Sequence, residues 1–175
     1  MAAHGDQTRK GGAIPYVSHL LGVTSLVLEA GGDEDMAIAG LLHDTIEDTA
    51  ATAAEIENRF GRRVAMIVMG CTDTDEHPKP PWRPRKERYL AHLGSPDTPA
   101  DVLTVSRADK LHNARTMLLD FRSKGDGFWA PFNAGVEEQL WYLSSLVDIF
   151  TDRLPGPMTD ELRRVCDELA AQAAR

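Results

Sequence analysis

Apolar positions recur at helical spacing along most of the chain. Between Tyr16 and Ala30, apolar residues stand at positions 16, 17, 20, 21, 23, 26, 27 and 28, and Gly31-Gly32 comes next. This pattern predicts an amphipathic helix that ends at the glycine pair. No alternating apolar and polar pattern persists long enough to predict a strand. Further helices are expected over residues 33–48, 52–60, 62–72, 85–93, 99–122, 133–153 and from 159 onward.

The predicted helices have recognisable ends. Thr52 and Glu55 have the spacing of a capping box, and Asn133 and Thr159 are candidate N-caps. Prolines at 78, 80, 81 and 84 predict a loop over 77–84, and residues 125–131 are expected to form another. The segment after the first loop is too short for an independent domain. We therefore expect one all-α domain over residues 1–175, with about seven to eight helices.

Length and composition are those of an ordinary globular domain. The chain has 175 residues, of which 42% are hydrophobic and 26% are charged. The formal net charge of −8 argues against binding a nucleic-acid polymer through a broad basic face. The polar first twelve residues do not resemble a signal peptide, and no apolar run is long enough to span a membrane. We expect a cytoplasmic protein, and a homo-oligomer is compatible with the sequence.

Cys71 and Cys166 lie far apart and lack the spacing of metal ligands. Both lie in partly apolar, helix-like stretches. We expect inert buried thiols rather than a disulfide.

The segment His43-Asp44-Thr45-Ile46-Glu47-Asp48 combines one imidazole with three carboxylates. On a continuous helix, His43 would face Glu47 and Asp44 would face Asp48. Such a concentration of like charge requires a neutraliser, and a divalent cation is the simplest one. The alternative is an acidic turn on a solvated helix end. The apolar run from Met36 to Leu42 argues against it, because this helix should be buried.

Two other stretches contain candidates for the same site. His19 lies in the first predicted helix and is either a core histidine or a metal ligand. Asp109, Asn113 and Thr116 fall at i, i+4 and i+7, so they share one helix face, with His112 nearby. This face either lines a polar pocket or is the solvated side of an amphipathic helix, and the surrounding apolar residues favour the pocket.

A basic cluster comes after the proline-rich loop. It contains Arg83, Arg85, Lys86 and Arg88, interrupted by Glu87. Arg85 and Lys86 could bind a distal phosphate, or the cluster could be a solvated helix face. The aromatic pairs 128–129 and 141–142 are expected to pack in the core.

Four segments in this order resemble the HD-domain phosphohydrolases, specifically the hydrolase domain of RelA/SpoT-type enzymes and the small alarmone hydrolases. They are residues 7–19 (QTRKGGAIPYVSH), 41–49 (LLHDTIEDT), 60–65 (FGRRVA) and 108–116 (ADKLHNART), and the motif-bearing core spans about residues 4–120. Departures flank the presumed substrate cleft. One extra residue precedes Pro15, Leu20 stands where a proline is common, and Asp73 replaces a basic residue. The unusual proline-rich loop adds to these differences, which concern the identity of the nucleotide rather than the metal core.

The resemblance implies a set of roles. His19, His43, Asp44 and Asp109 would bind one divalent ion, typically Mn²⁺, and Glu47 and Asp48 would be the acid/base pair. Arg9, Lys10, Asn113 and Thr116 would hold a small anionic nucleotide. The implied activity removes the 3′-pyrophosphate of guanosine tetra- or pentaphosphate. The alternatives are the same chemistry on an adenosine alarmone or NADPH, a non-catalytic nucleotide sensor, and an interaction module that uses the basic cluster.

Overall fold

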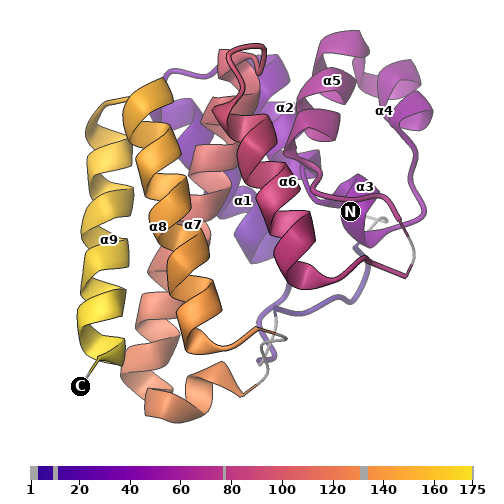
Figure 1. The fold of residues 1–175 in the computed structure, drawn as a ribbon. Coiled ribbons are helices and arrows are strands. Elements are labelled where there is room, and N and C mark those ends of the chain that lie inside the picture. The colour runs from indigo at the N-terminus through magenta and orange to yellow at the C-terminus, as the bar shows by residue number, and fades with distance from the viewer. Residues whose placement is uncertain (1–3, 10–11, 77, 131–133, 175) are drawn as a thin grey trace.

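Helices account for most of the residues that the computed structural model describes, which are 4–9, 12–76, 78–130 and 134–174 (Figure 1). These ranges contain no strand, and their one extended pairing is an isolated bridge between Thr8 and Pro15. The predicted all-α fold is therefore confirmed. The helices are α1 (Val17–Glu29), α2 (Glu34–Leu42), α3 (Thr45–Asp48), α4 (Ala53–Phe60), α5 (Arg62–Cys71), α6 (Trp82–Gly94), α7 (Ala100–Lys124), the 3-10 helix η1 (Gly125–Trp129), α8 (Val136–Arg153) and α9 (Pro157–Ala173).

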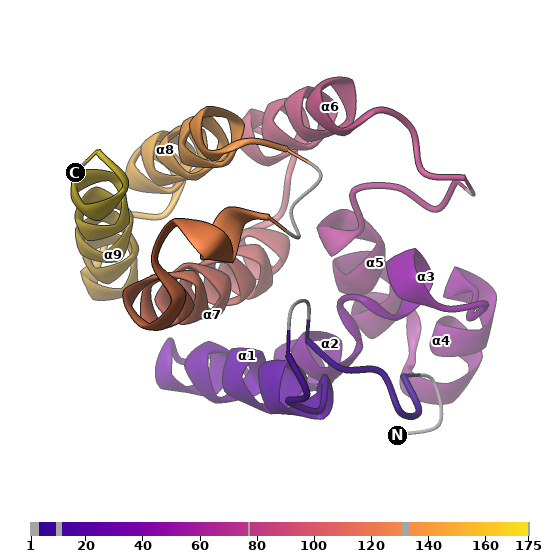
Figure 2. The same ribbon diagram turned by 90° about the horizontal axis from the view of Figure 1, so that it is seen from below.

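Helix α7 lies at the centre of the fold. It packs against α1, α2 and α5 on one side and against α8 and α9 on the other (Figure 2). Every residue from Val102 to Asp109 is buried, as expected for a helix that is covered on all sides. This arrangement places the carboxylate of Asp109 inside the protein, where it needs a partner of opposite charge.

The capping box predicted at the start of α4 is present. Thr52 Oγ1 accepts a hydrogen bond from the backbone N–H of Glu55 at 3.3 Å, and Glu55 Oε2 accepts one from the N–H of Thr52 at 2.8 Å. Gly61 separates α4 from α5 at φ +92°, a backbone conformation that favours glycine. These local signals fix where the chain reverses between the two helices.

Two predicted loops differ from the structure. The proline-rich loop is shorter than expected, because α6 already begins at Trp82. Pro84 is tolerated in the first turn of α6, where a backbone N–H has no acceptor within the helix. Residues 125–129 form η1 instead of an irregular loop.

The last two helices begin at glycine caps. Helix α9 starts at Pro157 with Gly156 as its N-cap. The prediction that Thr159 caps this helix was therefore wrong; its hydroxyl donates to the carbonyl oxygen of Leu154 at 2.7 Å. Helix α8 starts at Val136 after Gly135, and the predicted cap Asn133 lies outside the described residues.

Both cysteines are free and buried, as the sequence predicted. Burial raises the pKa of the Cys71 thiol to about 11 and that of Cys166 to about 12. Neither thiol is ionised at neutral pH, which makes both unreactive. Among the helices described, none combines the length and apolar character needed to cross a membrane.

Candidate functional site

Three buried side chains from different helices converge beside α7. One ligand atom each from His19, His43 and Asp109 lies within 4.8 Å of the others. His19 Nε2 is 3.2 Å from Asp109 Oδ1 and 3.3 Å from His43 Nε2. Helix α1 supplies His19, the end of α2 supplies His43, and α7 supplies Asp109. This group could hold a divalent metal ion, because imidazole and carboxylate are both ligands for such ions.

Asp44 lies against the same two imidazoles. Its Oδ2 atom is 2.9 Å from His43 Nε2 and 3.6 Å from His19 Nε2. The hydroxyl of Tyr16 donates a short hydrogen bond to this oxygen. Burial and the negative charge of Asp44 raise the pKa of Tyr16, which keeps the phenol protonated as a donor. The four predicted metal ligands are therefore close together in the fold.

The backbone does not reach this arrangement through one continuous helix, contrary to the sequence prediction for residues 33–48. Helix α2 ends at Leu42, His43 is its C-cap, and α3 begins at Thr45. The carboxylates that follow, Glu47 and Asp48, bind Lys79.

Neighbouring groups orient both imidazoles. His43 Nδ1 lies 2.9 Å from the carbonyl oxygen of Gly40, so it donates, and Nε2 is left as the acceptor. His112 Nδ1 lies 3.3 Å from Arg9 Nη1, which can only donate, so this imidazole nitrogen is an acceptor. His19 Nδ1 lies 2.9 Å from the same nitrogen and must be the donor. Both histidines thus use Nδ1 for a neighbouring acceptor and direct Nε2 toward the acidic side chains, as metal-ligating histidines do.

The electrostatics of the group also suit a cation. Burial lowers the pKa of His43, but the charges of Asp44 and Asp109 outweigh this effect and raise it well above its ordinary value. Burial opposes ionisation of Asp109, yet Lys110 and the two histidines hold its pKa well below the ordinary range. The carboxylates therefore stay ionised and draw positive charge into the site, as protons or as a metal ion.

Lys110 was assigned no role from sequence. Its Nζ lies 2.6 Å from Asp109 Oδ2; burial lowers the pKa of Lys110, but Asp109 and two neighbouring tyrosines together outweigh this effect and raise it well above its ordinary value. Asn113 Nδ2 donates to the other oxygen, Oδ1, at 2.6 Å. Two partners of Asp109 thus come from the helix that carries it, and the two histidines come from other parts of the fold.

Three of the residues predicted to hold a nucleotide, Arg9, Asn113 and Thr116, contact one another. Arg9 donates to Thr116 Oγ1 at 2.7 Å and to Asn113 Oδ1 at 3.4 Å. The predicted partner Lys10 lies outside the described residues. The alternative of a fully solvated helix side is wrong for this face of α7, because Asn113 and Thr116 are half-buried.

The two predicted acid/base carboxylates share one cation. Lys79, from the proline-rich loop, lies 2.8 Å from Glu47 Oε1 and 2.9 Å from Asp48 Oδ1. Burial raises the pKa of Glu47, as does the charge of Asp73, and Lys79 opposes both effects. Sequence reasoning missed Lys79; the only available signal was one basic residue in a loop of prolines.

Arg85 and Lys86 are not on a solvated helix face. Arg85 is 8% exposed, its Nη1 binds both carboxylate oxygens of Asp73, and Lys86 Nζ lies 2.5 Å from Asp73 Oδ2. Arg85 Nη1 is also 3.7 Å from Glu47 Oε1. The acidic residue that departs from the family pattern therefore pairs with both cations.

A cavity of about 260 Å³ opens next to this network. Its lining includes Arg9, Lys86 and Lys110, and also Asn113 and Thr116. These cations and polar groups would complement an anion. Aromatic side chains complete the wall: Trp82, Phe128 and Tyr142.

Tyr142 is 6% exposed, and its ring centroid lies 5.8 Å from that of Trp82. Its hydroxyl has no hydrogen-bond partner among the described residues. The prediction of core packing was correct for Phe128 and Tyr142, which are buried. It did not anticipate that both also line the cavity.

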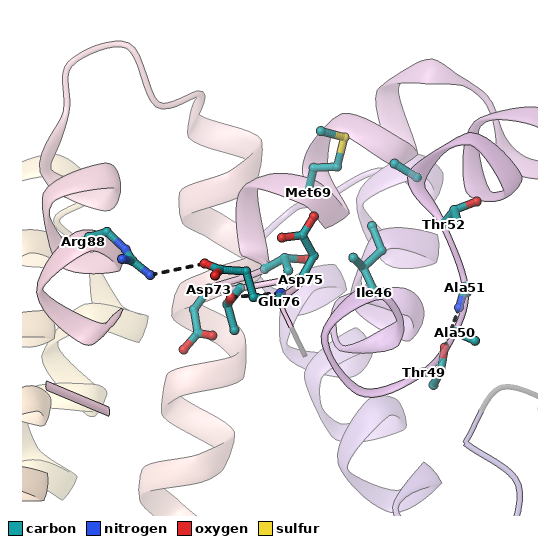
Figure 3. Close-up of a pocket in the computed structure, with 13 residues that line it drawn as sticks. Ile46, Thr49, Ala50, Ala51, Thr52, Met69, Asp73, Asp75, Glu76 and Arg88 are labelled. Atoms are coloured by element: carbon teal, nitrogen blue, oxygen red, sulfur yellow. Dashed lines mark hydrogen bonds and ion pairs between the residues drawn. The ribbon is translucent and has the colours of Figure 1, made fainter. Parts of the chain in front are cut away.

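A larger hollow of about 630 Å³ is lined by residues of α3, α5 and α6 and of the segments that follow α3 and α5 (Figure 3). Asp73, Asp75 and Glu76 are among its lining residues, and Arg88 is the one basic residue among those that the structure describes there. Figure 3 shows Glu76 directed at Arg88, to which it is paired at 3.8 Å. This acidic lining would repel a phosphate, so the smaller cavity is the better candidate for an anionic ligand.

The chain is similar in sequence and in fold to known proteins. The family model described as HD domain matches residues 1–136. The guanosine-3′,5′-bis(diphosphate) 3′-pyrophosphohydrolase of Aquifex aeolicus is 40% identical over 114 residues, which are 65% of this chain and 16% of that protein. The Xenopus tropicalis protein of that name, MESH1, is 40% identical over 117 residues, covering 65% of this chain and 63% of that one.

A solved structure described as a metazoan ortholog of SpoT that hydrolyzes ppGpp superposes with a TM-score of 0.74 at 26% identity. The match covers 98% of this chain and 89% of that one. By contrast, the chain spans only 15%, 16% and 20% of three long curated relatives.

Proposed function

Because the chain belongs to the HD-domain family, we propose that it is a metal-dependent phosphohydrolase that removes the 3′-pyrophosphate from guanosine tetra- or pentaphosphate. The observation that carries the proposal is the buried group of His19, His43 and Asp109, with Asp44 against both imidazoles. Relatives at 40% identity are named for this reaction. We propose that residues 1–175 act as one catalytic domain in the cytoplasm.

His19, His43, Asp44 and Asp109 would hold one divalent ion, which we propose to be Mn²⁺. The donor set fits such an ion, since both histidines direct Nε2 at the carboxylates and both carboxylates stay ionised. When bound, the ion would make an attacking water more acidic and offset the charge of the phosphoryl group.

Glu47 and Asp48 would transfer protons beside this ion. Neither carboxylate belongs to the His/Asp group, and both bind Lys79 instead. Burial and Asp73 raise the pKa of Glu47, which suits a carboxylate that must gain and lose a proton near neutral pH. We therefore assign Glu47 as the principal acid/base group, with Asp48 as its partner.

The nucleotide would occupy the cavity of about 260 Å³. Arg9 is already oriented by Asn113 and Thr116, and it would face the base or the sugar. Lys86 lines the same cavity and would bind a phosphate, with Arg85 behind it in the Asp73 pair. The unpartnered hydroxyl of Tyr142 would gain a hydrogen bond from a polar ligand there.

The same site chemistry could act on an adenosine alarmone or on NADPH, or the fold could bind a nucleotide without turnover. The test is to incubate the purified protein with Mn²⁺ and each nucleotide, and to separate the products by ion-exchange chromatography. We expect GDP or GTP together with pyrophosphate from the guanosine substrates. Cleavage of another nucleotide while guanosine tetraphosphate stays intact would overturn the substrate assignment. Binding without any cleavage would favour the sensor.

A further inference from the structure

A separate hollow of about 490 Å³ lies where α1, α7 and the start of α9 meet. Its lining includes Arg107 and Arg115 of α7, Glu29 at the end of α1, and Pro157 and Glu161 of α9. Among the described residues, none lines both this hollow and the cavity proposed for the nucleotide. An inference drawn from it is therefore independent of the proposed function.

Arg107 is a buried cation without an anionic partner. It is 7% exposed, and its Nη1 donates to two neutral acceptors, the carbonyl oxygen of Leu154 at 2.9 Å and Thr159 Oγ1 at 3.0 Å. Its Nε has no acceptor, and no carboxylate pairs with it, among the residues that the structure describes. Burial alone lowers its pKa. A buried charge that remains unpaired is costly, so this position favours a negatively charged ligand.

The first turn of α9 lies beside this guanidinium. Thr159, which accepts from Arg107, is the third residue of the helix. The N-cap is Gly156, which offers no side-chain acceptor for the free backbone N–H groups of the first turn. These groups and the helix dipole together attract anions. The seventeen residues from Pro157 to Ala173 form this helix.

The acidic residues of the lining leave room for an anion. Glu161 is already paired, at 3.3 Å with Arg115 and at 2.7 Å with Arg164. Glu29 is exposed and accepts a hydrogen bond from Ser25 at 2.9 Å. Its charge would oppose an anion at the rim without filling the position beside Arg107.

We propose that this hollow binds a tetrahedral oxyanion, either free phosphate or the phosphate group of a small ester, against Arg107 and beside the first turn of α9. Arg115 would add a second, more exposed positive charge at the mouth. Arg107 of α7 already contacts Leu154 and Thr159, on either side of the α8–α9 connection. An anion bound to Arg107 would therefore stabilise the packing of α7 against this connection.

The first test follows thermal unfolding of the metal-loaded protein against inorganic phosphate at constant ionic strength. In Arg107→Gln, the phosphate concentration needed for half of the Tm rise should increase roughly tenfold or more, because a charge-assisted hydrogen bond is lost. Arg122→Gln is the matched control, since Arg122 lies on the same helix but pairs with Glu168. Glu29→Gln, at an exposed position, should lower the required concentration roughly two- to fivefold.

Phosphate bound elsewhere would affect all four proteins alike. Equal responses of the wild type, Arg107→Gln and Glu29→Gln would therefore overturn the proposal. A crystal of the wild-type protein soaked in selenate provides a test that needs no variant. Anomalous density beside Arg107 is expected, and density only at other positions would refute the site.

Parallel titrations with pyrophosphate and glycerol phosphate identify the source of the oxyanion. Tighter binding of glycerol phosphate than of inorganic phosphate indicates an ester ligand. Tighter binding of inorganic phosphate indicates the free ion. A lack of any Arg107-dependent response to all three compounds contradicts the proposal.

Discussion

Lys79 Nζ lies 2.8 Å from Glu47 Oε1. This ion pair connects the proline-rich loop to the carboxylate that we assign as the acid/base group. The same ammonium group lies 2.9 Å from Asp48. The loop therefore controls the charge beside the site as well as connecting α5 to α6. Its influence on proton transfer can be measured directly.

Replacing Lys79 with Met should move the acidic limb of the kcat–pH profile to higher pH. The substitution removes the cation that lowers the pKa of Glu47, while burial and Asp73 continue to raise it. Glu47 can act as a general base only when it is ionised. If its pKa is higher, a higher pH is needed to ionise it and to reach full activity. Lys79→Arg keeps the charge and is the control. A Lys79→Met profile that coincides with the wild type would show that Lys79 does not tune Glu47.

Replacing Asp73 with Asn should shift the same limb in the opposite direction. After burial, the charge of Asp73 is the largest cause of the raised pKa of Glu47. Its loss also releases Arg85, whose Nη1 already lies 3.7 Å from Glu47. Both changes favour the ionised carboxylate, so the limb should move to lower pH. Asp75→Asn, an exposed neighbour, should leave the profile unchanged.

Glu47→Gln should abolish turnover while the protein still binds its metal ion. The amide cannot accept the proton, and general acid–base catalysis typically contributes about 10²- to 10⁴-fold. Steady-state kinetics and metal analysis of the same preparation test both parts. Glu57→Gln, on the exposed side of α4, is the control. Turnover at the wild-type rate would remove Glu47 from the mechanism, and loss of the metal would place it among the ligands.

His112→Phe should weaken divalent metal binding roughly 10- to 100-fold, the usual effect of removing a group that orients a ligand. Burial, followed by the charge of His19, lowers the pKa of His112 to about 4, so at neutral pH its Nδ1 can accept from His19. Phenylalanine fills a similar volume but accepts no hydrogen bond. Calorimetric titration with Mn²⁺ gives the affinity, and His92→Phe on α6 is the matched control. Equal affinities for both variants would be evidence against the orienting role.

Gly22 explains how the ring of His112 can approach α1 so closely. A Cβ atom at position 22 would overlap the imidazole of His112, whose contact with His19 depends on this approach. The glycine sits inside a helix, where it costs roughly 0.5–1 kcal/mol relative to alanine. Glycine at position 22 therefore lowers the stability of α1 slightly, but it leaves room for the imidazole of His112 beside the site.

The sequence by itself determined the helical architecture and the chemical character of the site. Apolar spacing and the Thr52–Glu55 capping box are local signals, and the helices they predicted are present because they depend on few distant contacts. The predicted ligands His19, His43, Asp44 and Asp109 lie together in the fold, and their metal-binding roles stay a prediction.

Only the tertiary structure decided how the charges are paired. The break between α2 and α3 was not foreseen, because the apolar pattern predicted one helix over residues 33–48. Lys79 reaches Glu47 across 32 positions of sequence, and Arg9 reaches Thr116 across 107. Such pairs form only where distant segments pack together, and the burial that results shifts the pKa values of the ionisable groups. The sequence therefore indicated which residues could bind a metal ion or transfer protons. The packing around α7 determined which of these side chains lie together and which charges pair with them.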